Sequence, residues 1–218
     1  MNEVLNKGYA KAVPAENTVK KNTWYILHHE LYHPKKKKFR AVFDCAATYQ
    51  NQSLNKNLLQ GPDLTNNLVG VLTRFRQEPV TFCCDIEGMF HQVRVNEEHR
   101  DLLRFLWWSN GNTVKEPQQY RMTVHLFGAT SSPGCANFAL KSTADDHKAE
   151  FGTAAANFLR NDFYVDDSLN SIGTVQEAVK LIKNTKVMCN KGGFNLQKFV
   201  SNSKEVFEEI PESDRAVA

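Results

Sequence analysis

Two short apolar runs in this chain each stop at aspartate. The run from Val80 to Cys84 is followed by Asp85, and the run from Phe163 to Val165 is followed by Asp166 and Asp167. Short runs rich in β-branched and aromatic residues predict strands, so these carboxylates are expected at the ends of neighbouring strands. Carboxylates brought close together repel one another unless protons or metal ions compensate their charge. The pattern therefore constrains both the sheet and the chemistry at its end.

The elements expected around these strands follow one another in a definite order. After the strand at 80–84 come a strand pair (102–108 and 119–124), a helix (136–148), the strand at 163–165 and an amphipathic helix over 175–187. This order predicts an α+β fold with a split β-α-β sheet of the ferredoxin-like kind. Upstream, strands at 24–27 and 39–44 predict a hairpin whose tip carries Lys35 to Lys38. A helix over 64–75 is expected to follow, with Asp63 as its N-cap.

Positive charge is concentrated at the start of the chain. Residues 1–40 contain nine Lys or Arg and three acids, although the net charge of the 218 residues is only +3. A basic front on a faintly acidic body suits a protein that holds a polyanion with one part and cations with another. A lysine-rich face that is simply solvated remains the alternative.

Several classes of protein are disfavoured by composition. No apolar run reaches the roughly 18 residues needed to span a bilayer, and the first residues lack a signal-peptide pattern, so we expect a soluble intracellular protein without a membrane partner, in a cytoplasmic particle or the nucleus. The five cysteines are an odd number with no C-x-x-C pair. Neither a disulfide framework nor a cysteine zinc site is therefore predicted.

The carboxylates themselves suggest a metal. Oxygen-only ligands select Mg2+ or Mn2+ over zinc, and two such ions about 3.5 to 4 Å apart serve phosphoryl transfer. Asp85, Asp166 and Asp167 are thus candidate ligands of a two-metal site. Taken alone, an Asp-Asp pair after a strand is also an ordinary turn.

Longer motifs around these residues resemble a known family. FYVDD (163–167), CCDIEGMF (83–90) and FGATSSP (127–133) resemble the palm of retroelement reverse transcriptases. The resemblance is more specific to the BEL/Pao class of long-terminal-repeat retrotransposons, and it covers roughly residues 5–210. The motifs that carry it are WYILHH (24–29), FRAVFDCAA (39–47), SLNKNLLQGPDL (53–64), DIEGMFHQV (85–93), RFLWW (104–108) and GGFNLQKF (192–199).

This resemblance implies an RNA-directed DNA polymerase that adds dNTPs to a primer 3′-hydroxyl on an RNA or DNA template. Two Mg2+ ions, with Mn2+ as an alternative, are implied as cofactors. By similarity, Asp85, Asp166 and Asp167 are the catalytic metal ligands, and the carbonyl of Ile86 adds a contact.

The same resemblance assigns substrate contacts. Phe90 lies where the family places a ring under the sugar, which implies selection of deoxynucleotides; a core phenylalanine is the alternative. Arg40 is implied as the residue that grips the triphosphate, aided by Lys38. The other residues assigned to substrate binding are Phe127 and Gly128, in the turn under the templating base pair, and Lys198, by analogy to a lysine that protonates pyrophosphate.

The resemblance also implies a domain plan. Residues 1–78 form the fingers side with the basic hairpin (24–44), residues 79–210 form the palm, and residues 211–218 are expected to be a frayed end. The thumb is missing, so we expect a polyprotein fragment whose partners include downstream thumb and ribonuclease H segments.

Three alternatives stay open. His29-Glu30-Leu31-Tyr32-His33 matches the HExxH pattern of zinc proteases, but the strand-like run before it and Pro34 after it disfavour the helix that this motif needs. A truncated, inactive remnant that only binds nucleic acid is a second possibility. An RNA-dependent RNA polymerase, which would incorporate ribonucleotides, is a third.

Overall fold

A computed structural model describes residues 1–14, 16, 22–34 and 37–216 of the chain. Its fold is α+β, as predicted. The chain forms two compact units, which we treat separately: unit 1 contains residues 1–61 and 93–132, and unit 2 contains residues 62–92 and 133–218. The units are interleaved in sequence, unlike the expected division at residue 78. The reason is that residues 93–132 supply strands to the N-terminal sheet, whereas residues 62–78 supply a helix that contacts the second sheet.

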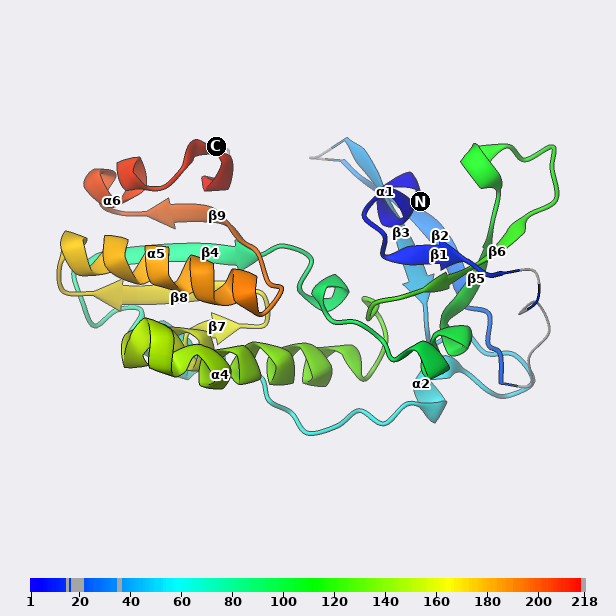
Figure 1. Ribbon diagram of the computed structural model, residues 1–218, viewed down its shortest axis with the longest axis horizontal. Coiled ribbons are helices and arrows are strands. Elements are labelled where there is room, and N and C mark those ends of the chain that lie inside the picture. Colours follow the sequence, from blue (N-terminus) through cyan, green and yellow to red (C-terminus); the bar gives the residue numbers. More distant parts are fainter. Residues whose placement is uncertain (15, 17–21, 35–36, 217–218) are drawn as a thin grey trace. The chain divides into compact units, whose positions relative to one another are not determined.

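Unit 1 contains a three-stranded sheet and a separate two-stranded hairpin (Figure 1). The sheet has the strand order β1-β6-β5, and the hairpin pairs β2 with β3 in antiparallel register from Leu27 opposite Asp44 to His33 opposite Lys38. Its elements are α1 (Asn2–Asn6), β1 (Ala10–Ala12), β2 (Leu27–His33), β3 (Lys38–Asp44), α2 (Leu54–Asn57), the 3-10 helices η3 (Glu97–Leu103) and η4 (Ser109–Gly111), β5 (Arg104–Trp107) and β6 (Gln118–Met122). The hairpin is thus confirmed in outline, although the predicted strand at 24–27 begins only at Leu27 and residues 35–36 of its predicted lysine-rich tip lie outside the described residues. Tyr25 instead makes an isolated bridge to Arg104.

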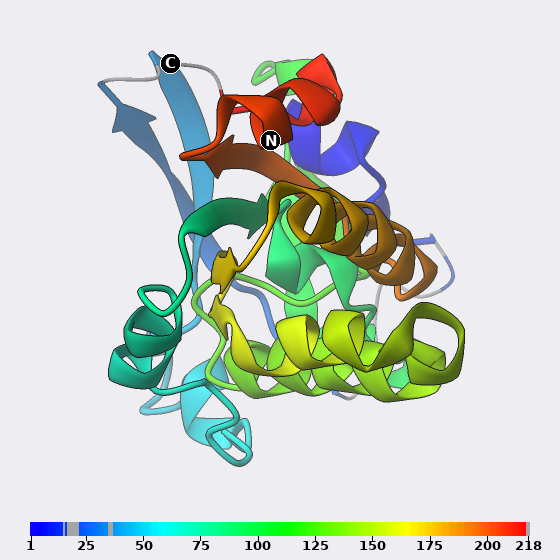
Figure 2. The ribbon, with the colours of Figure 1, turned by 90° about the vertical axis from the view of Figure 1, so that its left-hand side faces the viewer.

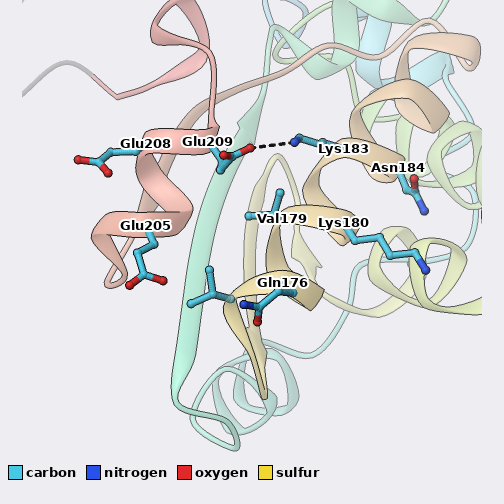
Figure 3. A pocket seen from close by; sticks show the side chains of 9 residues that line it. Gln176, Val179, Lys180, Lys183, Asn184, Glu205, Glu208 and Glu209 are labelled. Atoms are coloured by element: carbon cyan, nitrogen blue, oxygen red, sulfur yellow. Dashed lines mark hydrogen bonds and ion pairs between the residues drawn. The ribbon is translucent and has the colours of Figure 1, made fainter.

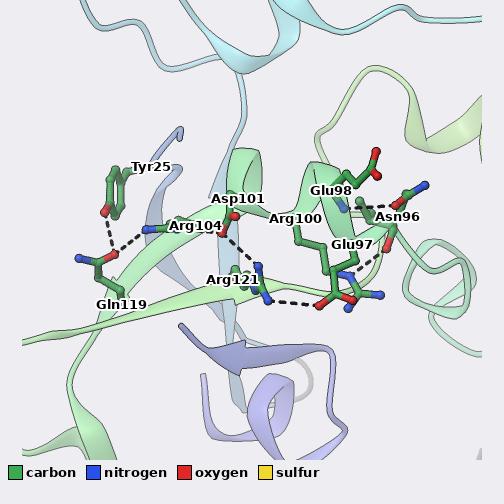
Figure 4. A network of polar contacts seen from close by, with 10 residues as sticks. Tyr25, Asn96, Glu97, Glu98, Arg100, Asp101, Arg104, Gln119 and Arg121 are labelled. Carbon is green, nitrogen blue, oxygen red and sulfur yellow. Dashed lines mark hydrogen bonds and ion pairs between the residues drawn. The ribbon is translucent and has the colours of Figure 1, made fainter. Parts of the chain in front are cut away.

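A buried polar network holds β5 and β6 to η3 in unit 1 (Figure 4). The guanidinium of Arg104, which is fully buried, donates from Nε and Nη2 to Oδ1 of Asp101 at 3.0 and 2.9 Å. The same oxygen accepts from Arg121 at 3.2 Å. Arg104 also donates to Gln119, whose side chain accepts from the Tyr25 hydroxyl at 2.8 Å. One buried carboxylate therefore compensates two guanidinium groups.

Two histidines in unit 1 are expected to make its stability depend on pH. Burial lowers the pKa of His28, whose ring packs against Phe43, Phe105 and Trp107, and burial also lowers the pKa of His125. A histidine with a lowered pKa in the folded state binds fewer protons there than in the unfolded chain. Protonation therefore favours the unfolded chain, so the free energy of unfolding is highest above pH 6.5, the ordinary histidine pKa, and falls as pH drops below it. We expect the free energy of unfolding of unit 1 to fall as pH drops from 7 to 5, and His28→Phe to flatten this dependence. The measurement is urea unfolding followed by tryptophan fluorescence.

Unit 2 is built on a four-stranded antiparallel sheet in the order β7-β8-β4-β9. The path β4-α4-β7-β8-α5-β9, with β4 between β8 and β9, is the split β-α-β arrangement that the sequence predicts. Its elements are α3 (Leu68–Arg74), β4 (Val80–Ile86), the 3-10 helix η2 (Met89–Gln92), α4 (Ser132–Asn161, in this unit from residue 133), β7 (Phe163–Tyr164), β8 (Asp167–Ile172), α5 (Val175–Lys191), β9 (Leu196–Ser201), α6 (Lys204–Glu209) and the 3-10 helix η5 (Glu212–Asp214).

The two faces of this sheet differ. Helices α4 and α5 lie on the same face (Figure 2), and the side chains that β4 turns toward the core, Phe82, Cys84 and Ile86, are almost completely buried. Because side chains alternate along a strand, Cys83 and Asp85 point to the opposite face, where they are only partly buried. The face opposite α4 and α5 therefore carries the predicted catalytic carboxylate of β4.

Several boundaries differ from those predicted. The helix at 64–75 begins only at Leu68 and is capped by Asn67, whose side chain accepts from the Gly70 amide, whereas Asp63 instead accepts from the Thr65 amide. Helix α4 extends from Ser132 to Asn161 and is interrupted at Gly152, well beyond the predicted 136–148. The C-terminal segment, predicted to be frayed from residue 211, is instead held in place up to Ala216, because the Ala216 amide donates to the Phe199 carbonyl of β9 at 3.0 Å. Residues 217–218 lie outside the described part.

Helices α4 and α5 approach so closely at one point that only glycine fits. A Cβ added at Gly192, which ends α5, would overlap the side chain of Thr143 on α4. We expect Gly192→Ala to lower the free energy of unfolding by about 1 to 3 kcal/mol through overpacking, measured by urea unfolding followed by circular dichroism. Gly70→Ala in α3 is the matched control, because its Cβ would lie 3.5 Å from Arg74 Nη1, an ordinary contact. Equal losses in the two variants would contradict this account.

Candidate functional site: a carboxylate cluster on the palm sheet

Strand pairing in unit 2 brings the three predicted aspartates together. Asp85, near the end of β4, is the register partner of Asp167, the first residue of β8. The amide of the next residue, Ile86, donates to the Asp166 carbonyl at 2.9 Å. Directly opposed residues of antiparallel strands have Cα atoms about 4.5 to 5.5 Å apart and place their side chains on the same face. The backbones that carry all three carboxylates are therefore adjacent.

A tight turn between β7 and β8 presents the tandem pair. Tyr164 pairs with Asp167, which leaves Val165 and Asp166 as the two turn residues. Two-residue hairpin turns require a positive φ, and Val165 adopts φ +58° although it is β-branched. For such a residue this backbone is strained, so the turn holds Asp166 and Asp167 in a conformation that the surrounding sheet must enforce.

Burial and neighbouring charges both act on the carboxylates of the cluster. Burial raises the pKa of Asp166, and the negative charges of Asp167 and Asp85 raise it further, while the Lys198 ammonium acts in the opposite direction. The charge of Asp167 also contributes to the raised pKa of the Cys83 thiol, after burial. The cluster thus carries an excess of negative charge that favours a bound cation.

Both carboxylate oxygens of Asp85 are engaged by β9. Lys198 Nζ lies 2.8 Å from Oδ2, and Gln197 donates from Nε2 to Oδ1 at 3.2 Å. The side chains of Lys198 and Asp85 are 49% and 24% exposed, so the ion pair sits at the solvent boundary. Asp85 is thereby held by the sheet next to it.

The carboxylates of Asp85, Asp166 and Asp167 are the kind of ligand that a hard divalent cation prefers, but their side chains are not arranged around a common point. Three carboxylates in adjacent backbone positions are the oxygen ligands that Mg2+ and Mn2+ prefer. Among the described residues, no three His, Cys, Asp or Glu side chains already converge as in a formed metal site. Both oxygens of Asp85 instead contact Lys198 and Gln197 of β9. A cation that used all three carboxylates would have to draw Asp85 away from Lys198.

Phe90 follows β4 on the 3-10 helix η2. It is only 8% exposed, next to Met89, which is almost completely buried. A ring this buried is consistent with the alternative of a core phenylalanine. Its role as a selector of deoxynucleotides therefore stays a prediction.

The remaining predicted contacts lie in unit 1. Arg40 is exposed on β3, while Lys35, Lys36 and the side chain of Lys38 lie outside the described residues. Phe127 is 48% exposed, and Gly128 follows it with φ +95°. A Cβ at Gly128 would lie 3.1 Å from the Phe43 carbonyl oxygen, so both the backbone conformation and the space favour glycine at this turn.

One residue that sequence reasoning missed organises this turn. Asn55 donates from Nδ2 to the Gly128 carbonyl at 2.9 Å, and its Oδ1 accepts from the Thr130 amide at 2.9 Å. Both ends of the side-chain amide are thus used to hold residues 128–130 against α2. In the sequence, this residue stands in a polar loop with no spacing that links it to Gly128.

The HExxH pattern is not a zinc site. His29 to His33 all belong to strand β2, where residues four apart are separated by about 13 Å along the chain axis. The prediction that this segment is not helical is confirmed.

A groove lies elsewhere on unit 2, between α5 and α6 (Figure 3). It has a volume of about 710 Å3, and its walls include Val179, Lys180 and Lys183 of α5 and Glu205, Glu208 and Glu209 of α6. The Lys183–Glu209 ion pair, at 2.9 Å, bridges the walls. None of the candidate catalytic residues lines this groove.

Comparison with solved structures identifies the fold. The native protease-reverse transcriptase of prototype foamy virus matches with a TM-score of 0.65 at 19% identity, over 93% of this chain and 23% of that chain. The chain has a reverse transcriptase-like fold. The foamy viral enzyme bound to double-stranded DNA matches with a TM-score of 0.62 at 18% identity, over 88% of this chain and 28% of that one. The complex with RNA/DNA hybrid gives 0.61 at 19%, over 89% and 22%.

The reverse transcriptase-like chain spans about a quarter of the length of these matched proteins. No family model matches its sequence, and no curated protein matches it. The likeness therefore concerns the fold, and the expected retrotransposon lineage rests on the motifs alone. Among the described residues, no helix has the length and apolar character required to cross a membrane.

Proposed function

We propose that the chain is the reverse transcriptase domain of a BEL/Pao-type retrotransposon polyprotein, and that it adds dNTPs to a primer 3′-hydroxyl on an RNA or DNA template. The observation that carries this proposal is the pairing of Asp85 with Asp167 beside the strained turn that holds Asp166. Phosphoryl transfer by two metal ions about 3.5 to 4 Å apart needs several oxygen ligands at one place, and this pairing brings carboxylates from two strands together. The foamy viral structures with double-stranded DNA and with RNA/DNA hybrid support nucleic acid as the partner class.

In this proposal Asp85, Asp166, Asp167 and the Ile86 carbonyl hold two Mg2+ ions, or Mn2+. When bound, these ions would neutralise charge on the attacking 3′-hydroxyl and on the leaving pyrophosphate. The chain's own contribution is to position groups. Its strained turn keeps two carboxylates beside β4, and the negative charges of three neighbouring aspartates would attract cations to that place.

Substrate contacts are proposed for both units. In unit 1, Arg40 and Lys38 would bind the triphosphate, and Phe127 and Gly128, held by Asn55, would pack against the nascent base pair. In unit 2, Phe90 would exclude a ribose 2′-hydroxyl and Lys198 would contact the pyrophosphate. Downstream thumb and ribonuclease H segments of the polyprotein are the proposed further partners.

A second candidate is an inactive remnant that only binds nucleic acid. The observation that favours it is the engagement of Asp85 by Lys198 and Gln197, which leaves the carboxylates unconverged among the described residues. In this alternative the exposed Arg40 and the lysine run of the hairpin would bind the polyanion without chemistry.

Primer extension separates the two. The native chain and the Asp166→Asn/Asp167→Asn variant are compared on an RNA template with a DNA primer, Mg2+ and either dNTPs or ribonucleotides. We expect extension with dNTPs by the native chain and none by the variant, with equal binding of the primer-template by both. Equal binding without extension by either protein supports the remnant, and extension with ribonucleotides supports an RNA polymerase.

A further inference from the structure

A β-bulge in unit 2 determines where the Lys198 side chain points. Asp85 pairs with Gln197, but two residues earlier on β4 Cys83 pairs with Val200, so Lys198 and Phe199 together oppose Cys84. In a regular strand Lys198 would share a face with Leu196, which is completely buried. The extra residue instead lets Phe199 enter the core, where it is completely buried, and leaves Lys198 on the same face as Asp85.

The backbone at the bulge is strained. Lys198 adopts φ +56°, in the left-handed region that residues other than glycine seldom use. Such a conformation persists only where the surrounding structure enforces it, and here it directs an ammonium group to 2.8 Å from Asp85 Oδ2. An ion pair this exposed contributes little to folding stability. The arrangement therefore has more effect on Asp85 than on the fold.

A cation at this position competes with any other cation that Asp85 could bind. The cluster contains three carboxylates and one ammonium, so it remains net negative, yet one of its ligands is already paired. A metal ion that recruits Asp85 must replace the ammonium, and Gln197 can keep hold of the second oxygen while this exchange happens.

We propose that Lys198 is a built-in cation for Asp85, which holds this carboxylate in place until a divalent ion replaces it and so weakens the affinity of the cluster for metal. The inference rests on the proposed function, in which the cluster binds Mg2+. It gives Lys198 a role before substrate arrives, as a positioning residue for a metal ligand. On release, the ammonium remains tethered beside the cluster.

The test measures metal binding without nucleotide or nucleic acid. Mn2+ affinity is determined by electron paramagnetic resonance for the native chain, Lys198→Gln and Lys198→Arg. We expect Lys198→Gln to bind Mn2+ about two- to fivefold more tightly, in line with the worth of an exposed ion pair, and Lys198→Arg to bind like the native chain. Lys191→Gln is the matched control, because it removes a lysine of similar exposure (42% against 49%) that pairs with Glu150 on α4.

A second measurement distinguishes direct pairing from a general effect of charge. The ammonium signal of Lys198, assigned by nuclear magnetic resonance through its loss in Lys198→Gln, should shift when Mg2+ is added and stay unshifted in Asp85→Asn. Unchanged or weaker Mn2+ binding by Lys198→Gln, or a Lys198 signal that ignores Mg2+, would overturn the role of Lys198 and leave the polymerase proposal standing. Absence of Mn2+ binding by the native chain would overturn both.

Discussion

Replacing Asp85 with asparagine is expected to reduce the rate of primer extension by more than about a hundredfold. The substitution preserves the shape of the side chain but removes the charge that β4 contributes to the cluster. Mutation of groups that merely orient metal ligands typically costs 10- to 100-fold, and loss of a ligand costs more. The rate is measured in single turnover with saturating primer-template and dNTP, so that weaker binding does not contribute.

The control for this variant is Asp146→Asn, which changes an exposed carboxylate on α4 in the same unit. It should extend primers like the native chain. Circular dichroism of both variants checks that the sheet is intact, since Asp85 is only partly buried and its backbone pairing does not depend on its charge. Extension by Asp85→Asn within tenfold of the native rate would remove Asp85 from the catalytic set.

The second large effect concerns stability. Asp101→Asn is expected to lower the free energy of unfolding of unit 1 by about 3 kcal/mol or more, because removing one partner of a buried ion pair leaves an uncompensated buried charge. In this case the fully buried Arg104 would lose the carboxylate that pairs with it, and Arg121 would keep only its contact with the exposed Glu97, while the size of the side chain at 101 stays the same.

Tryptophan fluorescence makes this measurement specific to unit 1. The chain has three tryptophans, Trp24, Trp107 and Trp108, and all of them belong to that unit. Glu97→Gln is the matched control, because its carboxylate also pairs with Arg121 but is 74% exposed and should contribute less than about 1 kcal/mol. If the two variants unfold at the same urea concentration, the network is not what holds β5 and β6 to η3.

Much of the palm sheet could be predicted from the sequence because its signals are local. The run of strand-forming residues at 80–84 and the short apolar run before Asp166 each form a strand. Because each strand is followed by aspartate, the sequence predicts that the carboxylates lie close together. The pairing of Asp85 with Asp167 itself is a register, which no local pattern specifies. The sequence predicted only that the aspartates lie at the ends of neighbouring strands, and the structure supplies the register.

The parts that were mispredicted or missed depend on contacts distant in sequence. The N-cap of α3 is Asn67 rather than Asp63, since the helix starts where it can pack against β7 and β8. The C-terminal segment is ordered through Ala216 because it docks on β9. Lys198 reaches Asp85 through a bulge, and Asn55 reaches Gly128 across 73 positions of the chain, so neither pairing has a signal in residue spacing.

The central claim is that Asp85, Asp166 and Asp167 gather a divalent cation. Cleavage of the chain by bound Fe2+ with ascorbate and peroxide tests it most directly, because radicals cut the backbone only near the ion. Mapping the fragments by mass spectrometry should show cuts at both 84–87 and 164–168, removed by excess Mg2+ and by Asp166→Asn. Cuts at one segment only, or cuts that persist in Asp166→Asn, would contradict a shared metal site.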